Sequence, residues 1–443
     1  MAHITPFRAL RYDPQRVRPS ECVTQPYDKI TPEMQEAYYR SNPHNLVRII
    51  LGKREPETAS DNVYTRAANH FREWRQQGIF LQDAQPSIYV YWQRFRIPGG
   101  AAEYERRGFI ALGKLEDYSA KVVFRHEQTL AKPKADRLDL LRATRAHFGQ
   151  IFMLYSDSGE IDQLLSSASP PDTEVTDEYQ VVHRMWRVSD PNTIALVCKK
   201  MQDKQLIIAD GHHRYETALN YRNERRKQAG DSDNPARPGS AGQDPSEIAP
   251  YDLVMMTFIN MNSEGLVVLP THRVVHGLSG FSPRDFIERV RNYFRVEEVD
   301  AAVDKSRAAG LLHEAGRTGT AILAVTRDRD FLLHSPSANS SLFSGLSARQ
   351  QRLDVVQLHK IILENVLGMS EESVRNQENL TYVRDGEEAI GRVRREMANI
   401  AFLMNPVPIQ QVRDIALAGE VLPQKSTDFY PKLLTGLTIY AMD

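Results

Sequence analysis

The sequence predicts a mixed α/β fold of the α+β class, and three observations support this. Short apolar runs typical of strands alternate along the chain with segments whose apolar residues recur at helical spacing. The composition, 41% hydrophobic and 26% charged, is that of a globular protein. Residues 206–226 have the pattern of a strand, a turn and a helix in direct succession. A chain of 443 residues exceeds the usual size of a single core, so we expect more than one domain.

In the first half of the chain, turn residues separate the predicted elements. Thr31 is a candidate helix cap and Pro32 suits the first helical position. We expect helices beginning at Pro32 and over 59–77, and strands over 45–51, 87–96, 107–114 and 151–155. Pro98-Gly99-Gly100 supplies the turn of an antiparallel hairpin.

In the second half, a segment rich in Gly, Ser, Asp and Pro over 228–250 predicts a mobile linker. Residues 252–260 and 266–269 form a hairpin candidate. Beyond residue 282 helix and strand patterns alternate. The predicted helices are 284–293, 353–366 and 387–397, and the predicted strands are 321–326 and 400–404. We therefore divide the chain into a domain over 1–280, with an antiparallel-sheet region inserted over about 55–190, and a C-terminal α/β subdomain over 281–443.

Composition argues against several function classes. The formal net charge is -1, so no global positive charge favours a nucleic-acid partner. Two cysteines are too few for a disulfide framework. The N-terminus has no apolar signal region and no apolar run is long enough to span a membrane. We expect a soluble, cytoplasmic protein.

The strongest chemical signal is Asp210-Gly211-His212-His213-Arg214. Gly211 permits a positive φ or a close approach to a ligand. The first turn of the following helix leaves N–H groups unpaired and its dipole favours an anion. Arg214 adds a bidentate donor set, and His212 and His213 add ring N–H donors. The pattern predicts a phosphate site, with Asp210 accepting a sugar hydroxyl, a metal-bound water or helix N–H groups.

Two other interpretations of this motif stay open. Asp210 could simply cap the helix, with solvated histidines and arginine on the first turn. His212 and Glu216, four residues apart, could bind a metal ion, although no further ligand lies at recognisable spacing and no metal ligand is assigned.

A second polar cluster runs from Arg125 to Arg137. His126 or Glu127 could act as a general base on a hydroxyl nucleophile. Lys134 and Arg137 could neutralise phosphate charge. The alternative is a solvated loop and helix start.

Residues 423–432, PQKSTDFYPK, form a third candidate. Lys425, Ser426 and Thr427 could bind an anion or close over a ligand. Alternatively, the hydroxyls only cap the segment, and Phe429 and Tyr430 pack into a core.

The segment LIIADGHHRYETAL resembles the signature of the ADP-dependent free-serine kinases, which share the ParB/sulfiredoxin fold. The whole chain resembles an uncharacterised bacterial and archaeal family, domain of unknown function 1015, which carries the DGHHR motif. The blocks that carry this resemblance are PFRALRYDP, QPYDKIT, NPHNLVRI, RHEQTLAKPKADR, ADGHHRYETAL, LDVVQLHKIILENVLG and LPQKSTDFYPKLLTGL.

The resemblance implies a ParB/sulfiredoxin-like nucleotide-binding core with large insertions. It implies phosphate contacts from Gly211, His212, His213 and Arg214, with Asp210 near the nucleotide or its Mg²⁺. The expected function is a kinase that uses Mg²⁺ with ADP or ATP on a small hydroxyl-bearing metabolite, such as free serine. The alternatives are a non-catalytic nucleotide-binding switch of the ParB type and a metal-dependent hydrolase.

Overall fold

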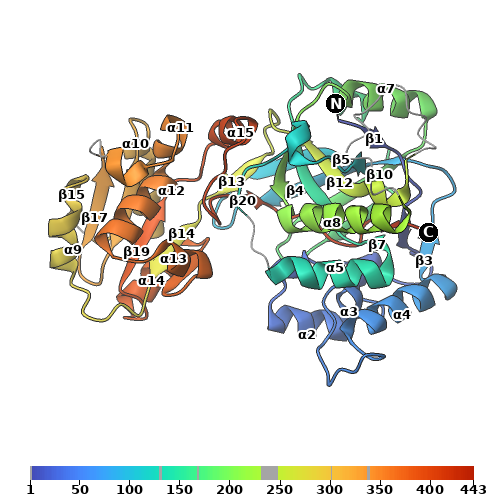
Figure 1. Ribbon diagram of the computed structural model, residues 1–443, viewed down its shortest axis with the longest axis horizontal. Coiled ribbons are helices and arrows are strands. Elements are labelled where there is room, and N and C mark those ends of the chain that lie inside the picture. Colours follow the sequence, from blue (N-terminus) through green and yellow to red (C-terminus); the bar gives the residue numbers. More distant parts are fainter. Residues whose placement is uncertain (1, 129–131, 167–168, 231–247, 301, 337–339) are drawn as a thin grey trace. The chain divides into compact units, whose positions relative to one another are not determined.

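The computed structural model describes residues 2–128, 132–166, 169–230, 248–300, 302–336 and 340–443, and its fold is mixed α/β (Figure 1). Its contacts divide the chain into two compact units. Unit 1 contains Met1–Arg125, Thr129–Val267 and Phe429–Asp443, and unit 2 contains His126–Gln128 and Val268–Asp428. The chain thus crosses between the units at 125/126, 128/129, 267/268 and 428/429. From the sequence alone we expect one boundary, after residue 280. Two short strands, β13 (Val267–Leu269) and β20 (Asp428–Tyr430), contain the crossing points at 267/268 and 428/429.

Unit 1 is built on a nine-stranded sheet in the order β6-β11-β8-β12-β5-β4-β10-β9, with β1 also paired to β5. Its strands are β1 (Ile4–Thr5), β4 (Ile88–Arg96), β5 (Glu103–Lys114), β6 (Val123–Arg125), β8 (Ile151–Tyr155), β9 (Thr173–Thr176), β10 (Val182–Val188), β11 (Leu206–Asp210) and β12 (Leu253–Asn260). The β4–β5 hairpin is antiparallel, as predicted. Six strands of the region over about 55–190, β4, β5, β6, β8, β9 and β10, therefore share one sheet with β11.

The helices and small strands of unit 1 complete its layers. They are α1 (Pro19–Cys22), η1 (Tyr27–Lys29), α2 (Pro32–Ser41), α3 (Val47–Ile50), α4 (Val63–Gln76), η2 (Tyr118–Ala120), α5 (Lys132–Thr144), α6 (Glu160–Leu164), α7 (Pro191–Met201), α8 (His212–Gln228) and η4 (Pro250–Asp252), with the strand pairs β2 (Leu10–Tyr12)–β3 (Phe80–Gln82) and β7 (Ala146–His147)–β21 (Tyr440–Ala441). In Figure 1, α8 lies next to the sheet, α5 lies beside α8, and α2 to α4 lie beyond α5.

Packing explains why α8 lies against the sheet. Its side chains Tyr215, Ala218 and Leu219 are buried at helical spacing in one core with Ile208 of β11 and Met153 of β8. The strand, turn and helix predicted over 206–226 are confirmed. Burial of this apolar face leaves the first turn of α8 at the end of β11, where the motif begins.

Two predicted elements of unit 1 are wrong. The apolar run 45–51 is not a strand but contains the short helix α3, because Asn45 accepts a hydrogen bond from the N–H of Val47 at 2.9 Å and starts a helical turn. A short apolar run cannot by itself distinguish a buried strand from a buried helix. The hairpin predicted over 252–269 does not form either, since β12 pairs with β8 and β5 on its two sides.

The predicted cap at Thr31 is confirmed, since its hydroxyl accepts from the N–H of Met34 at 3.3 Å. The linker predicted over 228–250 lies largely outside the described residues.

Unit 2 contains a six-stranded sheet whose pairings are all antiparallel, in the order β15-β17-β16-β19-β14-β18. The strands are β14 (His272–Val275), β15 (Arg295–Val299), β16 (Ala321–Val325), β17 (Asp330–His334), β18 (Leu380–Val383) and β19 (Ile400–Met404). Its helices are α9 (Pro283–Val290), α10 (Lys305–Gly316), η5 (Ser340–Phe343), α11 (Ala348–Gln351), α12 (Asp354–Gln357), η6 (Leu358–Val366), α13 (Glu371–Asn376), α14 (Gly386–Arg394) and α15 (Ile409–Leu417). The strands predicted over 321–326 and 400–404 are confirmed, while the helix predicted over 353–366 is α12 followed by the π-helix η6.

Candidate functional site

The DGHHR motif forms a tight strand-to-helix turn in unit 1. Gly211 is the residue before α8 and has φ 92°, in the left-handed region that favours glycine. No side chain caps this helix end, so Asp210 is not its cap. The backbone N–H groups of the first turn have no partner within the helix, and their dipoles point toward the turn. The geometry is that of a helix N-terminus, whose dipole favours an anion.

Arg214 folds back over this turn. Its Nη1 donates to the carbonyl oxygen of Gln150 at 2.5 Å, and its Nη2 lies 3.6 Å from Oδ2 of Asp210. A Cβ atom placed on Gly211 would lie 3.1 Å from Nε of Arg214, and one on Gly149 would lie 3.2 Å from Nη1. Both glycines therefore make room for the guanidinium group.

Positive charge surrounds the carboxylate of Asp210. Nζ of Lys432 lies 3.8 Å from its Oδ2, and the Lys432 side chain is only 10% exposed. Burial acts to raise the pKa of Asp210, but the charges of Lys432, Arg214, Lys29 and His212 outweigh it and hold the pKa well below its ordinary value. Asp210 is therefore ionised at neutral pH, and several cationic groups face a single motif carboxylate. Such an excess of positive charge favours a phosphate.

A buried arginine holds Lys432 in place. The Arg106 side chain is fully buried and donates from Nε to Oε1 of Gln93 at 3.0 Å and from Nη1 to the carbonyl oxygen of Tyr430 at 3.1 Å. Its Nη2 donates to Gln93 and to the carbonyl oxygen of Pro431. Gln93 in turn donates to the carbonyl oxygen of Lys432 at 2.9 Å. This network orders residues 430–432 beside the sheet.

A cavity of about 80 Å³ adjoins Arg214 in unit 1. Its walls are largely apolar and aromatic, and Tyr27, Phe148 and Arg137 are among the residues that form them. The guanidinium carbon of Arg137 lies 4.2 Å from the centre of the Tyr27 ring. Arg214 and Arg137 thus line one cavity, the arrangement expected of a site that accepts an anion joined to a flat or apolar group.

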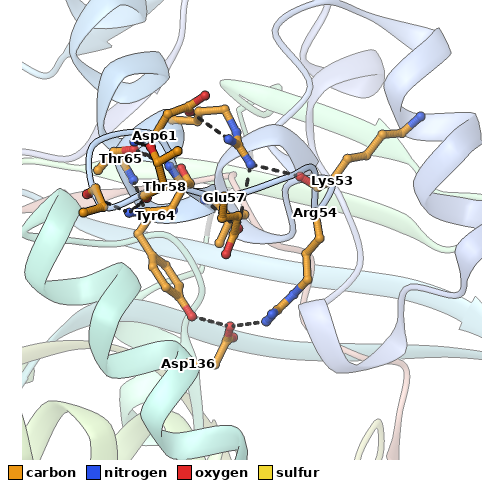
Figure 2. Close-up of polar contacts among 12 residues, drawn as sticks. Lys53, Arg54, Glu57, Thr58, Asp61, Tyr64, Thr65 and Asp136 are labelled. Carbon is orange, nitrogen blue, oxygen red and sulfur yellow. Dashed lines mark hydrogen bonds and ion pairs between the residues drawn. The ribbon is translucent and has the colours of Figure 1, made fainter.

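Arg137 is held by its neighbours in α3 and α5. Its Nε donates to Asp136 at 2.9 Å and its Nη1 to the carbonyl oxygen of Ile50 at 2.6 Å. Asp136 also accepts from the hydroxyl of Tyr64 at 2.9 Å, and Arg54 lies 3.4 Å away (Figure 2). Because Asp136 already compensates its charge, Arg137 is less available to a phosphate than Arg214.

The other predicted residues gather in unit 2. His126 is fully buried, and its Nε2 lies 2.7 Å from Oγ1 of Thr427. Glu127 accepts from the backbone N–H of Lys425 at 2.6 Å, and the hydroxyl of Ser426 donates to the carbonyl oxygen of Pro423 at 2.6 Å. The structure therefore brings His126 and Glu127 together with 425–427, and places Gly211, His212, His213, Arg214 and Arg137 in the other unit.

The hydrogen bonds of His126 and Glu127 stabilise the fold of unit 2. They hold the segment His126–Gln128 beside Leu422. The N–H of Leu422 donates to the carbonyl oxygen of His126 at 2.7 Å. Phe429 and Tyr430 of the same predicted block are buried in unit 1, as the packing alternative expected. The side chain of Lys134 lies outside the described residues.

Sequence reasoning missed three residues of the motif's surroundings: Lys29, Arg106 and Lys432. Lys29 and Lys432 stand within blocks that the family resemblance had marked, QPYDKIT and LPQKSTDFYPKLLTGL, and that was the available signal. Nothing in the local sequence distinguishes Arg106 from the other arginines of β5. Among the described residues, no group of three or more His, Cys, Asp or Glu side chains could hold a metal ion.

Residues 4–356 match a protein family described as protein of unknown function (DUF1015). The chain belongs to this family. No match among curated proteins reaches significance. No helix in the described residues is both long and apolar enough to cross a membrane.

Solved structures give remote likenesses to the fold. A free serine kinase in complex with AMP is 13% identical, covers 72% of this chain and 90% of its own, and has a TM-score of 0.34. A conserved hypothetical protein from Pyrococcus furiosus is 13% identical, with 70% and 88% covered and a TM-score of 0.33. C-terminally truncated SbnI from Staphylococcus aureus is 10% identical, with 74% and 87% covered and a TM-score of 0.35.

Proposed function

We propose that this protein is a nucleotide-dependent phosphotransferase that acts on a small hydroxyl-bearing metabolite, with free serine as one candidate. One observation carries the proposal: the 17-residue helix α8 begins directly after Asp210 without a side-chain cap, and several cations hold the pKa of that buried carboxylate low. A helix N-terminus with added guanidinium and ammonium groups is a general solution for binding phosphate.

Each part of the motif has a distinct role in this proposal. The N–H groups at the start of α8 bind phosphate oxygens, and Arg214 adds a planar pair of donors. Lys432 adds a positive charge that can stabilise the negative charge that develops on a transferring phosphoryl group. The apolar cavity beside Arg214 accepts the uncharged part of the nucleotide or of the acceptor.

Asp210 suits a magnesium ion bound to a nucleotide. Its carboxylate is kept ionised by the neighbouring cations, and Mg²⁺ commonly takes one or two protein carboxylates and completes its shell with phosphate and water. When bound, the ion would neutralise phosphate charge.

Glu127 remains our candidate general base and His126 its neighbour. Nε2 of His126 lies 3.9 Å from Oε2 of Glu127, while Oε1 of Glu127 accepts the hydrogen bond from Lys425. A general base takes the proton of the acceptor hydroxyl. If Glu127 has this role, Glu127→Gln lowers kcat and leaves the Kd of the nucleotide unchanged.

The test is a product assay on the full chain with Mg²⁺, each of ADP, ATP and CTP, and a panel of hydroxyl compounds that includes serine. We expect one phosphorylated product, lost in Arg214→Ala and kept in Arg225→Ala, a matched change in the last turn of the same helix. Product formation unaffected by Arg214→Ala would refute the role of the motif. Nucleotide binding without turnover on any acceptor would instead support the ParB-type switch.

A further inference from the structure

Unit 2 contains a large cavity of its own, with a volume of about 1080 Å³. Its walls come from β14, the end of α10, α12 and the loop that follows β19. Every lining residue belongs to unit 2, so the cavity is separate from the motif in unit 1. Its volume is at the upper end of the range typical of small-molecule sites.

Arg273 of β14 lines this cavity and is only 1% exposed. Its Nη1 donates to the carbonyl oxygen of Thr271, and its Nη2 donates to the carbonyl oxygen of Lys425 at 3.2 Å. Its Nε is buried and has no hydrogen-bond partner among the described residues. One donor of a buried guanidinium group is therefore unsatisfied, which is costly in a folded protein unless a ligand completes it.

The charge of Arg273 has no carboxylate in direct contact among the described residues, and its guanidinium carbon lies 5.2 Å from the centre of the Tyr382 ring. Burial lowers its pKa to about 10, against the opposing effect of Tyr382 and Glu127, so the group is still a cation at neutral pH. No carboxylate of the described residues forms an ion pair with it, whereas buried Arg222 has Asp117 at 2.9 Å. Carbonyl oxygens satisfy donors but do not neutralise a charge, and an unpaired buried charge is strongly unfavourable.

Other polar groups line the same cavity. Oε1 of Gln357 is buried without a hydrogen-bond partner among the described residues. Two exposed arginines, Arg317 and Arg352, lie on the cavity wall, and Asp354 is the one carboxylate among its lining residues. The lining thus carries more positive than negative charge, together with an amide that can orient a ligand.

We infer that unit 2 holds a second ligand site, in which Arg273 binds the carboxylate or phosphate of a small organic anion and Gln357 binds its polar substituents. A guanidinium group with a free Nε matches the paired oxygens of either anion. This site does not depend on the proposed phosphotransferase activity, because no residue of the motif contributes to it.

Calorimetric titration of the full chain carrying Arg214→Ala tests the inference, since that change weakens anion binding in unit 1. The probes are inorganic phosphate and glycerol phosphate in one arm, and succinate and glutamate in the other. We expect one arm to bind, and that arm identifies the anion. Hydrogen exchange with the bound probe should slow in peptides that cover 316–320 and 351–357, and not in those that cover 206–216.

Added variants at the cavity should weaken binding of the same probe. We expect Arg273→Met to weaken it about 100-fold, and Arg352→Ala or Gln357→Leu about tenfold, the usual effects of losing a charged or a neutral hydrogen bond. Arg349→Ala, an exposed arginine next to the cavity that pairs with Glu420, should leave it unchanged. The inference is wrong if neither arm binds, if exchange slows only over 206–216, or if the cavity variants bind as tightly as Arg349→Ala.

Discussion

Arg106 in unit 1 and Arg273 in unit 2 are both fully buried arginines that form no ion pair with a carboxylate of the described residues. Every nitrogen of the Arg106 guanidinium group donates a hydrogen bond, to Gln93 and to two backbone carbonyls. Arg273 lines a cavity and leaves Nε without a partner. The comparison teaches that burial alone does not mark a ligand site. Complete hydrogen bonding is what we expect of a structural arginine, and an unsatisfied donor in a cavity-lining residue is what we expect of a binding one.

The largest expected effect is a difference in the free energy of unfolding between variants of these two arginines. Arg106→Met leaves Gln93 and the carbonyls of 430 and 431 without donors, and we expect it to lower the free energy of unfolding by about 3–5 kcal/mol. Arg273→Met also leaves two carbonyls without donors, those of 271 and 425, but it removes a buried cation with an unsatisfied Nε, and we expect a net change within about 1 kcal/mol. Urea unfolding followed by circular dichroism measures both. Equal losses would mean that Arg273 is as structural as Arg106.

Gly211→Ala sharpens the role of the motif turn. A side chain at φ 92° strains the backbone by about 1–2 kcal/mol, and its Cβ would press on the Arg214 guanidinium group. We expect ADP binding to weaken about tenfold because Arg214 moves. Gly230→Ala is the matched control, since Gly230 has φ 80° and an added Cβ would meet no atom of the described residues within 4 Å. If both variants weaken ADP binding equally, strain rather than crowding of Arg214 is responsible.

Asp210→Asn tests whether the cationic side chains around Asp210 bind phosphate. Removal of the carboxylate frees Lys432 and Arg214, so we expect magnesium-free ADP to bind about three- to tenfold more tightly. Fluorescence titration at several salt concentrations measures this, and the gain should shrink as salt increases. Weaker binding at low salt would show that Asp210 itself contacts the nucleotide.

A fourth prediction concerns pH and the cavity of unit 2. Burial raises the pKa of half-buried Asp354 to about 6, against hydrogen bonds from Thr320 and the backbone of Ala321. A carboxyl whose pKa is higher in the folded chain loses stability as pH rises from about 4 to about 6, because the folded state holds the proton longer. We expect Asp354→Asn to match the wild type below pH 4 and to exceed it by about 1–2 kcal/mol at pH 7. A difference independent of pH would contradict the assigned titration.

The sequence predicted what depends on neighbours along the chain. The turn at Gly211, the strand before it and the buried face of α8 all follow from local spacing and from the conformational freedom of glycine. Tertiary contacts determined the rest. Lys432 reaches Asp210 only because Arg106 and Gln93 fix the backbone of the C-terminal segment, and no local pattern encodes that pairing.

The cavity of unit 2 could not be predicted from the sequence either, because tertiary contacts form it. His272 and Arg273 are buried because β14 pairs with β18 and β19, which lie more than a hundred residues further along the chain. The strand predicted over 45–51 was wrong for a local reason. The Asn45 side chain accepts a hydrogen bond from the N–H of Val47 and thereby starts a helical turn.

The most direct test of phosphate binding at the motif is calorimetric titration of ADP into the wild-type chain, Arg214→Ala and Arg225→Ala. If α8 and Arg214 hold the phosphates, the wild type and Arg225→Ala bind one ADP with the same Kd, and Arg214→Ala binds about 100-fold more weakly. Equal affinity in all three proteins, or no binding to the wild type, would contradict it.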